Sequence, residues 1–187
     1  MPFGRSRLPV NHDLIKPASW FYLATNRTFV KNRVKNDLEN WADQNPNSAP
    51  LRYLDAAFPI EVPLLPHLSH GSGLAVDFTF CYDREPIGLV YGATERPLEH
   101  EVDYPEKCSK SNPFYGATKF LKPFSKVGDL DESKSRSLIL SVVNRPQVQR
   151  IFLEPHLKQR WNLNLSKVRF HGCHAVRHDD HWHVDWK

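Results

Sequence analysis

The sequence predicts one domain that contains both helices and strands and is organised around the last strand of the chain. Its 187 residues are enough to bury a sizeable core, and 40% of them are hydrophobic. Apolar residues recur at helical spacing in some stretches and alternate with polar ones in others. Fifteen prolines against eight glycines indicate stiff connections between these elements.

The first part of the chain is expected to hold an irregular lead-in over residues 1–18, then a helix and two strands. Asn26 suits the N-cap of a helix over about residues 27–43, where an apolar stripe ends before a proline. Strands are predicted over residues 51–58 and 74–80. The prolines between these two strands favour extended backbone.

Residues 82–130 are expected to form a variable insertion within this single domain, which spans residues 1–187. They are rich in proline, lysine and glutamate and show no clear periodicity. A connection of this length is either functional, such as the wall of a substrate groove, or a surface insertion.

The last third of the chain returns to regular patterns. Asp131 or Ser133 suits the cap of a helix that runs through Asn144. The remaining elements are predicted at residues 148–153 (strand), 155–161 (short helix) and 167–170 (strand).

The C-terminal residues alternate between two classes of side chain, which is typical of a strand. One face would carry His181, His183 and Asp185, and the other would bury Trp182, Val184 and Trp186. Because neutral imidazole is the commonest metal ligand in proteins, the polar face suggests a metal site.

A second polar group stands at the other predicted strand. Asp77 lies in the middle of an apolar run, where an unpaired charge would be costly to bury, and His70 lies shortly before it. With His183, these side chains could hold Zn²⁺ through two imidazoles and one carboxylate and leave a fourth position for water. Asp185 or a backbone carbonyl is expected to orient a ligand imidazole.

Zinc would lower the pKa of its bound water toward about 7 and polarise a carbonyl, so a neighbouring base could activate that water. His181 shares the strand face of His183, and His178 lies in the preceding turn, so both are candidates for this base. Asp180 is a third candidate. His67 could help to hold an oxyanion or the substrate. The remaining histidines are expected to be less informative, and ordinary surface positions are predicted for His12, His100 and His156.

Charge and cysteine content narrow the function only slightly. A net charge of +4 and a pI near 9.0 favour an anionic partner such as nucleic acid, a membrane surface or cell wall. The three cysteines allow one disulfide and one free thiol, or three free thiols, at Cys81, Cys108 and Cys173. No apolar run approaches the ~20 residues of a membrane-spanning helix, and no signal peptide is recognisable.

Two motifs carry a resemblance to a known family. Residues 70–77 match the zinc motif His-x-x-Gly-x-x-x-Asp, and residues 181–183 match its partner His-x-His. Together they resemble the group of lysostaphin-type peptidases, D-alanyl-D-alanine carboxypeptidases and hedgehog proteins. The chain is most similar to the penicillin-insensitive murein endopeptidases, whose Arg-Ile-Phe-Val-x-Pro-x-x-Lys segment resembles residues 150–158. The resemblance covers about residues 51–80 and 137–187.

The resemblance implies an α+β fold with a small antiparallel central sheet, flanking helices and a zinc site on the sheet, as in hedgehog proteins and D,D-peptidases. It implies a metallopeptidase that cleaves amides in peptidoglycan cross-links. His70, Asp77 and His183 would bind zinc, and His181 and His178 would serve catalysis, with His67 nearby.

The chain departs from the family at three positions. Ala75 stands where a relative has an acidic residue, and Asp185 stands where it has a basic one. The glutamate that serves as general base in the carboxypeptidases is absent, and Asp180 lies roughly in its place. Which residue serves as the general base therefore stays open.

The sequence leaves other functions open besides hydrolysis of cell-wall cross-links. A non-catalytic zinc domain that binds cell wall or a partner is one, and a D-alanyl-D-alanine carboxypeptidase is another. Nucleic-acid binding is disfavoured because lysine and arginine are dispersed. A wall hydrolase would act outside the cytoplasm, yet no signal peptide is recognisable. The chain would therefore be a trimmed form, a phage lysis protein or an injected effector with an immunity protein.

Overall fold

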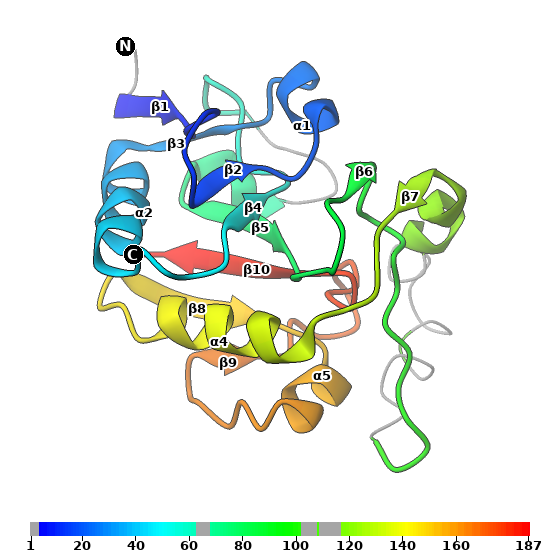
Figure 1. The fold of residues 1–187 in the computed structure, drawn as a ribbon. Helices are drawn as coiled ribbons and strands as arrows, with labels where there is room; N and C mark the ends of the chain where they lie inside the picture. The colour runs from blue at the N-terminus through cyan, green and yellow to red at the C-terminus, as the bar shows by residue number, and fades with distance from the viewer. Residues whose placement is uncertain (1–3, 63–67, 102–107, 109–116) are drawn as a thin grey trace.

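The structure is a computed structural model that describes residues 4–62, 68–101, 108 and 117–187. At its centre, six strands of the described chain form one sheet (Figure 1). Their spatial order is β2 (Ile15–Pro17), β4 (Leu51–Tyr53), β5 (Ala75–Thr79), β10 (His181–Trp186), β8 (Val148–Phe152) and β9 (Val168–Arg169).

The last strand of the chain occupies the interior of this sheet. β10 lies between β5 and β8 and runs antiparallel to both. β4 is antiparallel to β5, whereas the two edge strands, β2 and β9, run parallel to β4 and β8. The structure confirms a mixed α and β architecture with an antiparallel centre. The expected antiparallel sheet is corrected at both edges, where the pairing is parallel.

The apolar face of the sheet is covered by two helices, α2 (Asn32–Gln44) and α4 (Glu132–Val143). They share a core with the strands that includes Val34, Leu38, Phe78, Leu138, Val142, Trp182 and Val184. The shorter helices are α1 (Trp20–Ala24), α5 (Pro155–Arg160) and the 3-10 helices η2 (Leu68–Ser72) and η3 (Ala117–Phe124). Two ribbons complete the fold, β1 (Arg5–Arg7) with β3 (Phe29–Lys31) and β6 (Ile87–Gly88) with β7 (Ser125–Lys126).

The alternation in β10 sets its two faces as predicted. The ring of Trp182 packs against Phe78 with centroids 5.0 Å apart, and the indole of Trp186 donates to Asp37 Oδ2 at 2.8 Å. These tryptophans form part of the core with α2 and α4. The imidazoles and carboxylate on the other face are therefore directed away from the helices, toward the site described below.

Strand pairing overrides the helical pattern near residue 27. Residues Phe29–Lys31 form β3, which pairs with β1, so α2 begins at Asn32. Asn26 has a φ of 57°, in the left-handed region, and does not cap a helix. Residues 4–18, part of the stretch expected to be irregular, supply both β1 and β2.

The predicted elements of the last third are confirmed with small changes of boundary. Asp131 is the N-cap of α4, and its side chain accepts a hydrogen bond from the Lys134 amide at 2.9 Å. The strands β8 and β9 and the helix α5 occupy the predicted stretches. The strand expected over residues 51–58 is shorter and ends at Tyr53.

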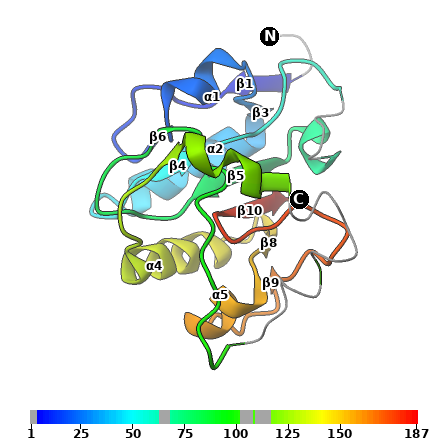
Figure 2. The same cartoon turned by 90° about the vertical axis from the view of Figure 1, so that its right-hand side faces the viewer.

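Residues 82–101 run from the sheet to α5, as the 90° view shows (Figure 2). The Glu95 amide bonds to the Asp179 carbonyl beside the start of β10. Further along, Arg160 of α5 pairs with Glu101 at 2.8 Å and donates to the Arg96 carbonyl. This segment therefore packs along the edge of the molecule where β10 begins.

Candidate metal centre

Strand register brings Asp77 and His183 together. In the antiparallel pair β5–β10, His183 lies directly opposite Asp77, and their side chains share one face of the sheet. His183 Nδ1 is 2.7 Å from Asp77 Oδ1. An imidazole from the end of the chain and a carboxylate from the middle of β5 are thus brought into contact.

The third side chain comes from the 3-10 helix before β5. His70 Nε2 lies 3.1 Å from His183 Nδ1 and 3.3 Å from Asp77 Oδ1. Ligand atoms of a tetrahedral zinc ion, at 2.0–2.2 Å from the metal, are roughly 3.3–3.6 Å apart. Two separations lie close to that range, and the shorter third is a hydrogen bond that a metal ion would replace. His70, Asp77 and His183 therefore form a group able to hold a metal ion.

Hydrogen bonds behind the ligands orient both imidazoles. His70 Nδ1 donates to the Ala56 carbonyl at 2.7 Å, which leaves Nε2 as the acceptor. His183 Nε2 donates to Asp185 Oδ1 at 2.9 Å, so loss of the proton that Nδ1 donates to Asp77 would leave Nδ1 as the ligand atom. The other oxygen of Asp185 accepts from Arg150 Nε at 2.6 Å. A carbonyl or carboxylate behind each ligand imidazole is the usual arrangement at protein metal sites.

The charge of this group favours a cation. Asp77 and His70 are fully buried, and His183 is 2% exposed. Burial alone would lower the pKa of His183, but hydrogen bonds to Asp185 and Asp77 raise it to about 9. In the metal-free protein a proton on His183 thus offsets the buried carboxylates. Metal binding would displace that proton.

His181 lies next to the ligands and is paired with Asp180. Its Nδ1 is hydrogen-bonded to Asp180 Oδ1, while its Nε2 lies 3.9 Å from Asp77 Oδ2. Burial would lower the pKa of His181, but the carboxylates of Asp77 and Asp180 raise it overall. Asp180 also accepts a hydrogen bond from the Gly92 amide. Asp180 is therefore the partner of His181 rather than a side chain that faces the ligand atoms itself.

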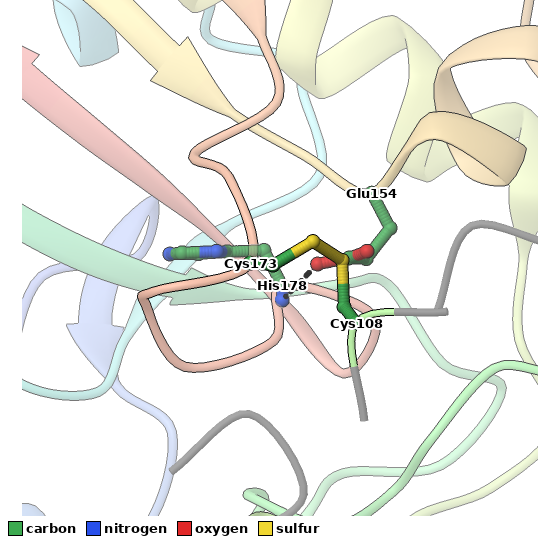
Figure 3. Close-up of a disulfide and its surroundings, with 4 residues drawn as sticks. All are labelled: Cys108, Glu154, Cys173 and His178. Carbon is green, nitrogen blue, oxygen red and sulfur yellow. Dashed lines mark hydrogen bonds between the residues drawn. A yellow bond between two sulfur atoms is a disulfide. The ribbon is translucent and has the colours of Figure 1, made fainter. Parts of the chain in front are cut away.

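His178 packs among the other imidazoles. Its ring centroid is 4.9 Å from that of His181 and 5.8 Å from that of His183. Burial, followed by these two imidazoles, lowers the pKa of His178 well below its usual range. Its backbone amide donates to Glu154 Oε1 at 2.9 Å, which anchors the turn before β10 (Figure 3). A neutral His178 is thus placed beside the group.

The other predicted histidines have different outcomes. His67 lies outside the described residues. His156, expected at the surface, is fully buried, and its Nε2 contacts the Glu95 carbonyl at 3.1 Å. His171 is exposed and stacks on Phe152 with ring centroids 4.0 Å apart, close to the metal ligands.

Sequence patterns missed Tyr91 and Asp55. The Tyr91 hydroxyl lies 2.8 Å from Asp77 Oδ2 and 3.1 Å from Asp55 Oδ2. Tyr91 belongs to the segment that lacks periodicity, so no local signal marks it. Asp55 lies in the apolar stretch after β4, and the argument used for Asp77, a carboxylate in an apolar run, could have found it.

Comparison of the chain with protein-family models finds no match, and comparison with curated proteins finds none either. What these side chains can do is therefore inferred from their geometry and from the motifs in the sequence. In the part of the chain that is described, no helix is long and apolar enough to cross a membrane.

A disulfide closes the region around His178. Cys108 and Cys173 are bonded with their Cα atoms 4.8 Å apart, and Cys81 is not in a disulfide. Figure 3 shows this disulfide with Glu154 and His178 in its surroundings. The bond links the segment after β6 to the loop that carries His178. Of the two cysteine states that the sequence left open, the structure therefore shows one disulfide and one free thiol.

Proposed function

We propose that the chain is a zinc-dependent hydrolase of amides in peptidoglycan cross-links, of the murein endopeptidase type. The observation that carries this proposal is the convergence of His70, Asp77 and His183 from distant parts of the chain. These are the three positions that the two sequence motifs single out. Two imidazoles with one carboxylate form a ligand set that recurs in catalytic zinc sites.

The bound ion would polarise the amide carbonyl and lower the pKa of a water molecule. His181 would take a proton from the attacking water and give it to the leaving amine. Both transfers would use its Nε2, because its Nδ1 is engaged by Asp180. The Asp180 carboxylate would hold this imidazole in one orientation and stabilise its protonated form. His178, kept neutral by burial, would contribute to the polar surface beside His181.

Two features support a cell-wall substrate outside the cytoplasm. The net charge of +4 suits an anionic polymer. The Cys108–Cys173 disulfide suits an oxidising compartment, because such bonds are rare in the reducing cytosol. Delivery by an injection machinery would require an immunity protein in the producing cell.

A non-catalytic zinc domain is the second candidate, and the burial of the ligands favours it. His70, Asp77 and His183 are at most 2% exposed, and structural zinc sites are closed to solvent. Such a domain would bind zinc and wall fragments or a partner without hydrolysing them.

Incubation of the purified protein with cross-linked muropeptides tests the proposal. Cross-linked dimers should decrease in the presence of zinc, persist with a chelator and decrease again after zinc is restored. H181A should keep zinc and lose turnover. H174A, which alters an exposed histidine in the preceding loop, is the matched control and should behave as the wild type.

Each outcome distinguishes the candidates. Zinc binding without turnover would favour the non-catalytic domain, and release of only terminal D-alanine would favour a carboxypeptidase. A folded chain that binds no zinc would overturn all three of these zinc-dependent functions.

A further inference from the structure

Tyr91 contacts the carboxylate of the candidate metal centre from the segment between β6 and η3. The side chain is 6% exposed, and its hydroxyl lies 2.8 Å from Asp77 Oδ2. The same hydroxyl is 3.1 Å from Asp55 Oδ2. No sequence motif includes Tyr91, and the proposed hydrolysis assigns it no part.

The two oxygens of Asp77 have different surroundings. Oδ1 faces His70 Nε2 at 3.3 Å and His183 Nδ1 at 2.7 Å, so it points into the ligand group. Oδ2 points to the phenol of Tyr91. A carboxylate without such a partner can turn and offer a metal either one oxygen or both. A hydrogen bond to Oδ2 would favour binding through Oδ1 alone.

A phenol carries a single hydrogen, so only one of the two carboxylates receives it at a time. The shorter distance assigns this hydrogen to Asp77. Asp55 has another charge partner, because Arg27 Nε lies 3.2 Å from its Oδ1. The Arg27 charge offsets that of Asp55, which leaves the Tyr91 hydroxyl for Asp77.

The ring of Tyr91 makes a second contact at the site. It meets the His181 imidazole edge to face, with centroids 5.0 Å apart and planes at 90°. Replacing Tyr91 with phenylalanine keeps this ring contact and removes only the hydroxyl. The effect of the hydroxyl can therefore be separated from the effect of packing.

We propose that Tyr91 is a positioning residue that holds Asp77 as a ligand through one oxygen and so sets the metal affinity of the site. This inference rests on the proposed zinc centre. It assigns to the segment after β6 a role in metal binding, although its residues lie outside both zinc motifs. Hydrogen-bond partners of metal ligands typically change metal affinity about 10–100-fold when they are removed.

Tyr22 supplies a matched control. It is fully buried, and its ring centroid lies 6.1 Å from that of Tyr91. Its hydroxyl accepts a hydrogen bond from the Val90 amide at 3.1 Å. Y22F thus removes a buried hydroxyl from the same cluster without touching the Asp77 carboxylate.

The experiment compares zinc affinity in the wild type, Y91F and Y22F by competition with a chromophoric chelator. Y91F should bind zinc about ten-fold more weakly or worse, while Y22F should bind as the wild type does. The visible absorption of bound Co²⁺, which reports the number and arrangement of ligand atoms, should change in Y91F alone. Thermal unfolding of the metal-free proteins checks that all three chains are folded.

Unchanged zinc affinity and an unchanged cobalt spectrum in folded Y91F would overturn the inference. Equal losses in Y91F and Y22F would also overturn it, because both would then reflect packing. If Y91F does not fold, 3-fluorotyrosine at position 91 keeps the ring and strengthens the hydroxyl as a donor, and an unchanged affinity would then count against the inference. A wild-type chain without zinc affinity would overturn the metal centre itself, whereas zinc binding without hydrolysis would leave the role of Tyr91 intact.

Discussion

The Asp185 carboxylate accepts a hydrogen bond from His183 Nε2 at 2.9 Å and holds the imidazole with Nδ1 turned toward Asp77. Both residues lie on the same face of β10, two positions apart. Arg150, from the neighbouring strand β8, holds the other oxygen of Asp185. The orientation of one candidate metal ligand therefore depends on a row of side chains that crosses two strands.

The first prediction concerns this row. D185A should weaken zinc binding about ten-fold, because His183 loses the acceptor that fixes its tautomer and its orientation. Chelator competition measures the affinity. The control is E39A, which removes a partly exposed carboxylate from α2. Equal zinc affinities in the two variants would show that Asp185 does not orient the ligand.

The second prediction concerns the coupling between metal and stability. Zinc at a hundred-fold excess over its dissociation constant should stabilise the folded chain by about 2.7 kcal/mol, because the ligands converge only in the folded state. Thermal unfolding with and without zinc measures this effect. H183A should show little or no increase, since it lacks one of the three ligands. A similar increase in H183A would locate zinc binding elsewhere.

The third prediction is a pH dependence that arises away from the metal centre. Burial is the main cause that lowers the pKa of His156 to about 4 in the folded protein. Its pKa in the unfolded chain is near 6.5, so unfolding favours protonation between these values. The contribution of His156 to stability is complete above about pH 6.5 and is lost as the pH falls toward 4.

Urea unfolding at several pH values between 7 and 4 checks this pH dependence. Replacing His156 with glutamine removes the titrating group, so the stability of H156Q should fall less steeply than that of the wild type over this range. H100Q, at an exposed position, is the control and should follow the wild type. Parallel curves for H156Q and the wild type would contradict the prediction.

The fourth prediction concerns the Cys108–Cys173 bond, which spans 65 positions of the sequence. Replacing both cysteines with serine should lower the free energy of unfolding by about 2–4 kcal/mol, because a long loop in the unfolded chain is no longer closed. Denaturant unfolding without reductant measures the loss. A reducing agent should destabilise the wild type and leave the double variant unchanged. Stability that is insensitive to both treatments would argue against the bond.

The faces of β10 were predictable from sequence, because side-chain direction alternates with every residue of a strand. The pattern around Asp77 and the motif positions of His70 and His183 were sufficient to name the ligand group. Each of these signals lies within a short stretch of sequence or combines two such stretches. α4 was equally predictable, since its apolar spacing and its Asp131 cap lie within one stretch of chain.

Long-range pairing decided the rest. Residues 29–31 form a strand because β1 lies beside them, and the edge strands are parallel because of the path that the chain takes between them. Tyr91 reaches Asp77 from a segment without any periodic signal, and Cys108 meets Cys173 across 65 positions. The amino-acid sequence by itself determined which side chains could bind a metal, because that depends on residue type and local spacing. The sequence also suggested Asp185 or a backbone carbonyl as the group that orients a ligand imidazole. Only the tertiary structure decided that Asp185 holds His183 and the Ala56 carbonyl holds His70. It alone brought in Tyr91 and Arg150, because hydrogen bonds and charge pairs form between whichever atoms folding brings within about 3 Å.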